Sequence, residues 1–326
     1  MGWTVAITGP TGEIGISAVN ALEKHPEVDR IVGMARRAFS PEARGWTKTE
    51  YRQGDILDRD AVDALVADAD IVVHLAFIIM GSRDESARIN LAGTRNVFEA
   101  TVASERARRL VYTSSVAAYG YHSDNPSPIT EDVPPRGSPE HYYSEQKAAC
   151  EAVLADVTAG SSLEVFVLRP CIVAGPNAPA LADAMPWTHL PAGVRKASQM
   201  LPLLKPLIPD PGTPMQLVHH DDVADAIALA ATTSAPPGAY NLAGEGVLSI
   251  SDVVEALGAR AIPVPHVLMT AASEVMARVP FLPSAVEWLH AGRASVVMDT
   301  SKAKTQLGWT PRHTAGETLS ALADSI

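Results

Sequence analysis

The sequence predicts an α/β protein built on a doubly wound, parallel β-sheet. Short apolar runs alternate with amphipathic helical stretches from the first residues onward, which is typical of strands buried on both faces. A glycine-rich turn joins the first apolar run to the first helical stretch. The 326 residues, 47% of them apolar, are enough for one large core with a smaller, mostly helical lobe on the C-terminal side.

The first half of the chain supplies most of the alternation. Apolar runs predict strands over 3–8, 30–34, 70–75, 109–113 and 163–168. Apolar residues at helical spacing predict helices over 12–25, 61–67, 83–104 and 140–156. Asp58 is expected to cap the second helix, because its carboxylate can accept a bond from a free backbone N–H.

The pattern changes after Gly175. Nine prolines lie between residues 176 and 214, and proline removes the donors that a sheet needs. We therefore predict an irregular, partly helical cap there instead of a regular sheet. The sheet is expected to resume at 216–218, followed by a helix over 222–231 and a strand over 240–243. These elements divide the chain into a core, 1–175 and 215–245, and a cap, 176–214 and 246–326.

Composition excludes several classes of protein. The net charge of −11 and the pI near 5.4 disfavour nucleic acid or a membrane surface as a partner. Two cysteines, Cys150 and Cys171, do not make a disulfide framework, and they lack close metal-ligand partners. The N-terminus has no basic segment of a signal peptide, so we expect a soluble, cytoplasmic protein.

The turn after the first strand reads Thr8-Gly9-Pro10-Thr11-Gly12-Glu13-Ile14-Gly15. Gly9 permits a tight turn, Gly12 lets the backbone approach a pyrophosphate, and Gly15 allows close packing of the helix. The N-terminus of the helix offers free N–H groups to phosphate oxygens. An ordinary glycine-rich turn is the alternative, but the strand before and the helix after favour a dinucleotide site.

This turn resembles the TGxxGxxG turn of the extended short-chain dehydrogenase/reductases, which bind a dinucleotide on a Rossmann-type sheet. Four later segments are similar to that family in the same order: 54–58, 72–76, 90–96 and 217–224. The resemblance covers nearly the whole chain and is weak over the proline-rich cap. It implies a Rossmann core, a small-molecule substrate bound by the cap, and a homodimer formed by helices 83–104 and 140–156.

The resemblance also implies which residues bind the cofactor. They are Gly9, Thr11, Gly12, Glu13, Ile14, Asp55, Ile56, Leu75, Ala76, Phe77, Asn90, Thr113, Tyr143, Lys147, Pro170 and Ile172.

The end of the second strand indicates which cofactor is bound. NAD enzymes of this architecture carry a carboxylate there, which binds both ribose hydroxyls. This chain instead reads Gly33-Met34-Ala35-Arg36-Arg37. A guanidinium can pair a 2′-phosphate through two hydrogen bonds, so Arg36 and Arg37 favour NADP over NAD, unless they are merely solvated.

Tyr143 and Lys147 lie four residues apart on a predicted helix and therefore share a face. Ser114 and Ser115 follow the fifth strand, at the edge of the sheet where ligands bind in doubly wound folds. By resemblance, Ser115 is the catalytic serine, Ser114 is its neighbouring alternative, Lys147 also holds the nicotinamide ribose, and Asn90 supports the proton path.

Such a set suits carbonyl reduction. Tyr143 can donate a proton to the developing alkoxide and take it back in the oxidative direction. Moving a tyrosine pKa from about 10 to neutrality requires roughly 4 kcal/mol, and we expect the Lys147 ammonium to supply an interaction of that sign. Ser115 is expected to hydrogen-bond the substrate oxygen.

The run His219-His220-Asp221-Asp222 invites comparison with a metal site. Neighbouring side chains on a strand point to opposite faces, so four consecutive ligands are implausible and no metal is predicted. Asp221 or Asp222 is expected to cap the next helix.

The resemblance leaves the reaction open. Sugar-nucleotide dehydratases of the family carry Asp-Glu where this chain has Ser115-Val116. Sugar-nucleotide enzymes carry an asparagine at the position of Ile172 and an arginine near 214–216, where this chain reads Pro-Met-Gln. These departures favour the reductase and hydroxysteroid-type branches.

We therefore expect an NADP(H)-dependent oxidoreductase acting on an apolar or semi-polar carbonyl or alcohol. An NAD-dependent sugar-nucleotide epimerase is the alternative enzyme. A non-catalytic redox sensor or structural subunit is disfavoured by the presence of Ser115, Tyr143 and Lys147. Apolar residues that could line the substrate pocket, or equally form ordinary core, are Met185, Trp187, Leu190, Met200, Leu201, Leu203, Leu204 and Leu207.

Overall fold

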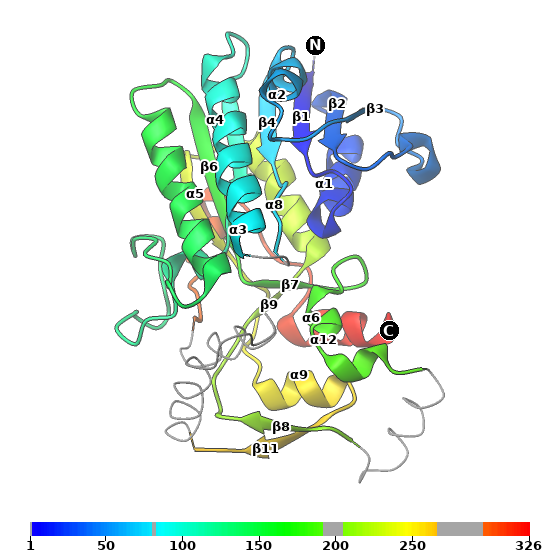
Figure 1. Ribbon diagram of the computed structural model, residues 1–326, viewed down its shortest axis with the longest axis vertical. Coiled ribbons are helices and arrows are strands. Elements are labelled where there is room, and N and C mark those ends of the chain that lie inside the picture. The colour runs from blue at the N-terminus through cyan, green and yellow to red at the C-terminus, as the bar shows by residue number, and fades with distance from the viewer. Residues whose placement is uncertain (1, 80–82, 192–204, 266–295) are drawn as a thin grey trace.

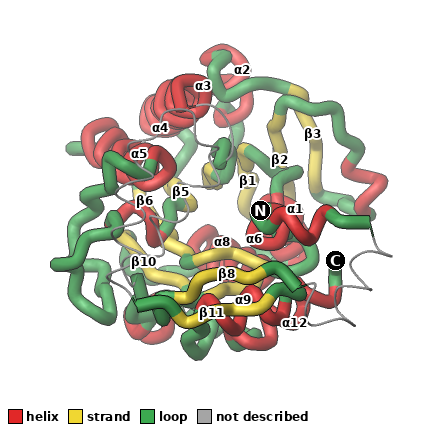
Figure 2. The backbone as a smooth tube through the Cα atoms, turned by 60° about the horizontal axis from the view of Figure 1, so that its bottom comes forward, coloured by secondary structure: helices red, strands yellow, loops and turns green. Residues whose placement is uncertain are grey.

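The computed structural model describes residues 2–79, 83–191, 205–265 and 296–326. Seven parallel strands form one sheet in the order β10-β6-β5-β4-β1-β2-β3 (Figures 1 and 2). Their bounds are β1 (Trp3–Thr8), β2 (Val28–Ala35), β3 (Thr49–Gln53), β4 (Ile71–His74), β5 (Arg109–Thr113), β6 (Glu164–Pro170) and β10 (Gly238–Leu242). The strand order reverses between β1 and β4, so the predicted doubly wound fold is confirmed.

Helices cover both faces of this sheet. Val5 and Ile7 of β1 pack in the layer formed with α1 (Glu13–Lys24) and α8 (His220–Thr232), whereas Ala6 packs in the opposite layer. The opposite layer contains α2 (Arg59–Val66), α4 (Thr94–Ala103) and α5 (Tyr142–Thr158). Among the described helices, none has both the length and the apolar character needed to cross a bilayer.

A smaller lobe lies below the carboxyl ends of the strands (Figures 1 and 2). Two short parallel pairs build it, β7 (Ile172–Ala174) with β9 (Leu217–His219) and β8 (Leu207–Asp210) with β11 (Arg260–Pro263). Its helices are α6 (Ala180–Asp183), α9 (Ile250–Ala256) and α12 (Ala315–Asp324). Elsewhere along the chain there are short helical turns. Three are 3₁₀ turns, η1 (Pro41–Arg44), η3 (Val116–Tyr119) and η4 (Pro186–His189), and one is a π-helical turn, η7 (Ala303–Leu307).

Two expectations about this lobe were wrong. β8 lies inside the proline-rich segment that was predicted to contain no sheet, and Pro209 is one of its residues. An outer strand with one neighbour tolerates proline, because N–H groups on its open side need no partner. The strand predicted at 216–218 exists as β9, but it pairs with β7 in the small lobe and does not join the seven-stranded sheet.

The predicted helix over 83–104 is not one regular α-helix. It is divided into α3 (Arg83–Ala87), a π-helical turn η2 (Arg88–Gly93) and α4. A π-turn rotates the residues after it relative to the turn before, and such turns are frequent at functional sites. Asn90, a predicted site residue, lies in this turn.

Candidate active site

The glycine turn is closed by backbone contacts that exclude larger residues at two positions. Gly9 has a φ of +74°, and a Cβ there would lie 2.9 Å from the Ala76 backbone nitrogen. A Cβ on Gly15 would lie 2.0 Å from the Gly9 carbonyl oxygen. A Cβ on Gly12, the residue before α1, would lie 3.5 Å from its nearest neighbour, the Gly9 carbonyl oxygen. The backbone at the start of α1 can therefore be approached closely beside Gly12, at a helix N-terminus of the kind that binds phosphate.

A cavity of about 270 Å³ opens beside this turn. The predicted cofactor residues that line it are Gly9, Thr11, Gly12, Arg36, Arg37, Asp55, Ile56, Leu75, Ala76 and Phe77. Five further lining residues were not predicted, namely Met34, Ala35, Gly54, Ile78 and Ile89. The structure thus brings segments from four strand ends to one hollow at the carboxyl edge of the sheet.

Other predicted cofactor residues lie outside this lining. Glu13 is hydrogen-bonded to the Ala180 backbone, and its pKa is raised by burial and by nearby Asp183. Ile14 packs against the core below α1 and α8, and Ile172 packs in the small lobe. Pro170 is buried at the end of β6. The Thr113 hydroxyl is buried without a hydrogen-bond partner among the described residues, and its carbonyl accepts a bond from Lys147.

A larger hollow of about 790 Å³ lies at the opposite edge of the sheet. Its walls include Trp3, Asp70 and Arg109, at or beside the amino ends of β1, β4 and β5. Asp70 is already paired with Arg106, and Arg109 with Glu164. Ligands of doubly wound folds bind at the carboxyl ends of the strands, which is the edge where the smaller cavity lies.

Arg36 and Arg37 are exposed on the rim of the smaller cavity. Their carbonyl oxygens are held by β3, since Tyr51 donates to Arg37 and the Gln53 amide donates to Arg36 at 3.0 Å. Within the described parts of the chain, neither guanidinium forms an ion pair. Both cations are therefore available to an anionic ligand.

Ser115, Tyr143 and Lys147 come together at the end of β5. Ser115 caps η3 by accepting the Ala117 N–H at 3.2 Å, and it is hydrogen-bonded to Tyr143. The Lys147 ammonium donates to the Thr113 carbonyl at 3.0 Å and lies 3.7 Å from the centre of the Phe77 ring.

The neighbouring serine is engaged elsewhere. The Ser114 hydroxyl donates to the Glu151 carboxylate at 2.5 Å. Of the two serines, Ser115 is therefore the one that faces Tyr143.

Burial changes the acid–base chemistry from what the sequence predicted. It raises the pKa of Tyr143 to about 12, against the opposing hydrogen bond from Ser115. It lowers the pKa of Lys147 to about 8. The expectation that Lys147 would bring Tyr143 toward neutrality was wrong for this state of the protein. Removing either group from water disfavours its charged form, and the Lys147 nitrogen lies 5.9 Å from the Tyr143 ring centre.

Asn90 holds the loop that follows β4. Its amide accepts the Ile78 N–H at 2.8 Å and donates to the Ile78 carbonyl at 2.9 Å and to Gln146 at 2.7 Å. Asn90 thereby ties the loop that carries Phe77 to helix α5. The contacts of Asn90 with Ile78 and Gln146 could not be predicted from the sequence, because they depend on the π-turn.

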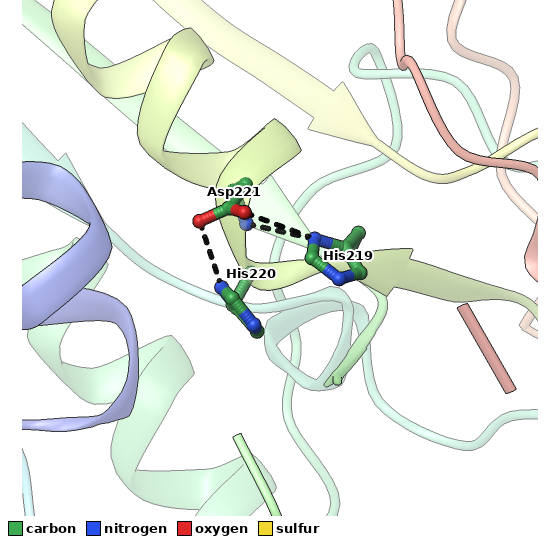
Figure 3. A group of neighbouring side chains, drawn as sticks. All are labelled: His219, His220 and Asp221. Atoms are coloured by element: carbon green, nitrogen blue, oxygen red, sulfur yellow. Dashed lines mark hydrogen bonds and ion pairs between the residues drawn. The ribbon is translucent and has the colours of Figure 1, made fainter. Parts of the chain in front are cut away.

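His219, His220 and Asp221 lie close together at the junction of β9 and α8 (Figure 3). Their possible ligand atoms are within 4.8 Å of one another, so the expected placement on opposite faces was wrong. The reason is local: β9 ends at His219 and the helix begins at His220, so strand alternation does not apply.

The hydrogen bonds of this group oppose metal binding. His220 Nε2 accepts the Asn177 N–H at 3.2 Å, which leaves the proton on Nδ1, facing Asp221 at 3.0 Å and Ser17 at 2.8 Å. His219 Nδ1 accepts the Asp221 N–H at 3.2 Å and so caps α8. The ring lone pairs of both histidines are thus already engaged.

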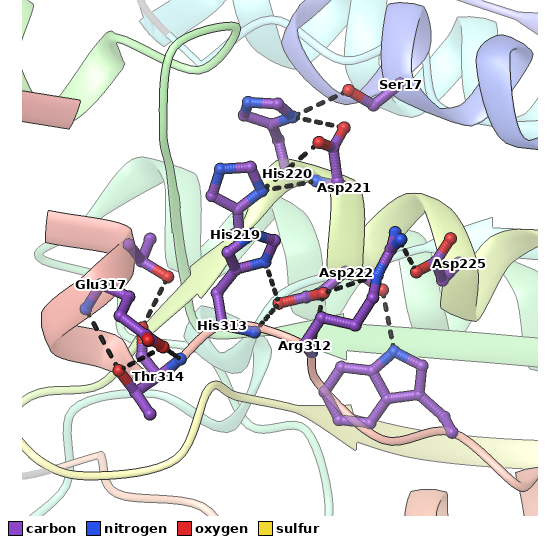
Figure 4. A network of polar contacts seen from close by, with 12 residues as sticks. Ser17, His219, His220, Asp221, Asp222, Asp225, Arg312, His313, Thr314 and Glu317 are labelled. Carbon is purple, nitrogen blue, oxygen red and sulfur yellow. Dashed lines mark hydrogen bonds and ion pairs between the residues drawn. The ribbon is translucent and has the colours of Figure 1, made fainter. Parts of the chain in front are cut away.

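The predicted caps of α8, Asp221 and Asp222, were therefore wrong. Asp222 is fully buried and accepts the backbone N–H groups of Arg312 at 2.9 Å and His313 at 3.0 Å (Figure 4). The His313 ring stacks on His219, with centres 4.0 Å apart. This network joins α8 to the segment before α12.

The candidate pocket residues of the cap have separate environments. Trp187 is buried and donates its indole N–H to the Leu257 carbonyl at 2.9 Å, and Met185 packs against the same cluster, so both belong to the core. Leu190 and Leu207 are exposed. Met200, Leu201, Leu203 and Leu204 lie outside the described residues.

Comparison with known proteins agrees with this architecture. The model of the NAD dependent epimerase/dehydratase family matches residues 5–243. A dTDP-6-deoxy-L-talose 4-dehydrogenase (NAD(P)(+)) of Kitasatospora kifunensis is 29% identical, over 98% of this chain and 94% of its own. A UDP-glucose 4-epimerase of Lactobacillus helveticus is 25% identical, over 95% and 92%.

Solved structures share the fold. The UDP-glucuronic acid 4-epimerase from Bacillus cereus, in complex with NAD, has a TM-score of 0.73 against this chain at 20% identity. The likeness covers 99% of this chain and 98% of that one. Since the family model spans most of the sequence, the protein is an enzyme of the NAD-dependent epimerase/dehydratase family.

Proposed function

We propose that the protein is an NADP(H)-dependent oxidoreductase that transfers hydride between the nicotinamide and a carbonyl or secondary alcohol. One observation carries the proposal: Ser115, Tyr143 and Lys147 meet at the end of β5, next to a cavity whose rim holds two arginines that form no ion pair with any described residue. The proposed substrate is an apolar or semi-polar small molecule.

The residues present fit a dinucleotide. Gly12 leaves room for a pyrophosphate at the N-terminus of α1, and the buried Thr113 hydroxyl lacks a partner among the described residues. Arg36 and Arg37 would hold a 2′-phosphate, and Asp55 with Ile56 lines the part of the cavity proposed for the adenine. By family resemblance, Lys147 would hold the nicotinamide ribose.

When bound, the nicotinamide supplies or accepts the hydride. Ser115 would donate a hydrogen bond to the substrate oxygen, and Tyr143 would give that oxygen a proton as it becomes an alkoxide. The raised pKa of Tyr143 keeps the proton on the phenol before reaction. The Lys147 ammonium would stabilise the phenolate that remains, and the surrounding aromatic rings exclude water.

The NADP preference rests on the rim of the cavity. Arg36 and Arg37, which form no ion pair within the described parts of the chain, would bind a 2′-phosphate with charge-assisted hydrogen bonds. The Kitasatospora relative, whose name includes NAD(P)(+), is consistent with a site that accepts the phosphate. The solved structure from Bacillus cereus contains NAD, so the preference is proposed for this chain alone.

A sugar-nucleotide epimerase that retains NAD is the second candidate, and the named relatives favour it. Two features of this chain oppose it. Ile172 occupies the position of the family asparagine and packs in the small lobe. The Gln216 amide, near the position of the family arginine, is bonded to both backbone groups of Met298, at 2.8 and 3.3 Å.

The deciding experiment measures NADPH oxidation by the purified protein across a panel of ketones and aldehydes, with Tyr143→Phe as the control. We expect turnover that depends on Tyr143. Extraction of the purified protein for bound nucleotide tests the alternative. Tightly held NAD together with interconversion of UDP-sugars, and no net NADPH oxidation, would replace the proposal with the epimerase. Nucleotide binding without either reaction would instead indicate a sensor or structural subunit.

A further inference from the structure

A buried ion pair lies behind the proposed catalytic residues. Glu151 of α5 and Arg169 of β6 have side chains that are 7% and 6% exposed. The pairing is bidentate, with Arg169 Nη2 at 2.5 Å from Glu151 Oε2 and Nε at 3.0 Å from Oε1. Glu151 follows Lys147 by four residues, as Lys147 follows Tyr143, so all three share one face of α5.

The same carboxylate holds the serine turn. Glu151 Oε1 also accepts the Ser114 hydroxyl at 2.5 Å, and Ser114 directly precedes Ser115. One side chain therefore joins the helix that carries Tyr143 and Lys147 to the strand end that carries Ser115. The remaining Arg169 nitrogen, Nη1, donates to the Tyr119 hydroxyl at 2.8 Å, in the turn that follows Ser115.

Glu151 also carries a negative charge close to Lys147. Burial lowers the pKa of Lys147, while charge on Cys150 and on Glu151 opposes that change. The Cys150 thiol is itself neutral at ordinary pH, because burial raises its pKa. Other titratable groups near the ammonium, His74 of β4, Tyr112 of β5 and Tyr143 of α5, are also neutral, since burial favours their uncharged forms.

We propose that Glu151 is a positioning residue of the active site: it holds the Ser115 turn against α5 and keeps Lys147 an ammonium ion at neutral pH. The proposal rests on the proposed roles of Ser115 and Lys147. An ion pair that merely stabilised the fold would affect the unfolding temperature without changing the titration of Lys147.

The first test follows Lys147 directly. Protein labelled with carbon-13 at the lysine ε carbon is titrated by NMR, and the Lys147 signal is assigned from Lys147→Arg. In Glu151→Gln the Lys147 pKa is expected to fall by about one pH unit, because the ammonium loses its neighbouring anion. Glu145→Gln, an exposed glutamate on the same helix, is the matched control and should leave it unchanged. An unchanged pKa in Glu151→Gln overturns the proposal.

This titration uses neither cofactor nor substrate, so its failure is distinct from failure of the proposed reaction. Glu151→Gln leaves Arg169 buried without a counter-ion, which can prevent folding. Glu151→Gln/Arg169→Met removes both charges and is expected to lower the Lys147 pKa as well, because the Cys150 thiol is neutral and Glu151 is the anion that opposes the effect of burial on Lys147.

Ser114→Ala tests the hydrogen bond between Ser114 and Glu151 and keeps the Glu151–Arg169 ion pair. It removes one hydrogen bond to Glu151 and leaves the Ser115 hydroxyl in place. We expect kcat to fall about tenfold with the Lys147 titration and the NADPH Kd unchanged, a loss equal to about 1.4 kcal/mol. Wild-type kcat in a folded Ser114→Ala protein would show that the carboxylate does not position Ser115.

Discussion

At the scale of single residues, the site depends on two ionisable groups removed from water. Tyr143 and Lys147 could be predicted from their spacing, because positions four apart share a helix face. The direction in which the Tyr143 pKa is shifted could not be predicted from the sequence. It depends on burial among side chains distant in sequence, such as Phe77, whose ring meets the Tyr143 ring edge-on at 5.6 Å.

Tyr143→Phe tests the acid–base role. The change removes the proton donor and keeps the ring that packs against Phe77. We expect kcat to fall by about 10²–10⁴-fold, with the Kd for NADPH close to that of the wild type. Steady-state kinetics and a fluorescence titration on the same preparation measure the two quantities. A variant that turns over normally would assign proton transfer to another group.

Lys147 is expected to cost stability at neutral pH. Its folded pKa is about 8, below the ordinary 10.5, so the unfolded chain holds the proton more tightly. As pH rises from about 8 to 10.5, the folded protein loses a proton that the unfolded chain keeps, and this penalty disappears. The penalty at neutral pH is at most about 3 kcal/mol.

Lys147→Met should therefore raise the unfolding temperature at neutral pH and abolish activity, and the thermal advantage should shrink as pH approaches 10.5. Thermal unfolding across pH measures this, with exposed Lys24→Met as the matched control. A lower unfolding temperature for Lys147→Met at neutral pH would mean that the bond to Thr113 outweighs the cost of burial.

At the scale of elements, strands and helices could be predicted wherever the local sequence pattern determines them. β1 was predicted with its observed bounds, and Asp58 caps α2 through the Ala61 N–H, as expected. β3 was missed because it is polar and partly exposed. The β8–β11 pair was missed because its partners lie some 50 residues apart, so that their pairing leaves no local signal.

Substitution of Gly12 and of Gly15 in the phosphate turn should affect different properties, nucleotide affinity for Gly12 and thermal stability for Gly15. Gly12→Ala places a methyl group at an ordinary contact distance from Gly9, so the protein should fold normally but bind NADPH at least about tenfold more weakly. Gly15→Ala forces a Cβ against the Gly9 carbonyl, so it should lower the unfolding temperature itself. Thermal unfolding and NADPH titration on both variants separate the effects. Equal nucleotide affinity in Gly12→Ala would move the pyrophosphate away from this turn.

At the scale of the whole molecule, the two parts of the fold meet at the start of α8. The Asp222 carboxylate accepts backbone N–H groups of the 312–313 segment, and His220 is hydrogen-bonded to Ser17 of α1 (Figure 4). His220 also accepts the Asn177 backbone N–H. The junction could be placed from the sequence but its contacts could not, because they join segments 43 to 203 residues apart. The division into core and cap, the cytoplasmic location and the homodimer stay predictions.

Asp222→Ala should destabilise the protein by about 1–3 kcal/mol, because two partly buried N–H groups lose the buried carboxylate that accepts their hydrogen bonds. Asp225→Ala, three residues along the same helix, removes a half-buried carboxylate that pairs with Arg312 and should cost less than about 1 kcal/mol. Urea denaturation of both variants gives the comparison. Equal losses would show that the junction is held by its apolar contacts.

The most direct test of the account is a fluorescence titration with NADPH and with NADH, on the wild type and on Arg36→Ala/Arg37→Ala. Binding of NADPH at least about tenfold tighter, with that margin lost in the double variant, is the predicted result, and it would assign about 1.4 kcal/mol or more of selectivity to the two arginines. NADH that binds as tightly as NADPH to the wild type would contradict the proposed cofactor, and tightly held NAD would favour the epimerase.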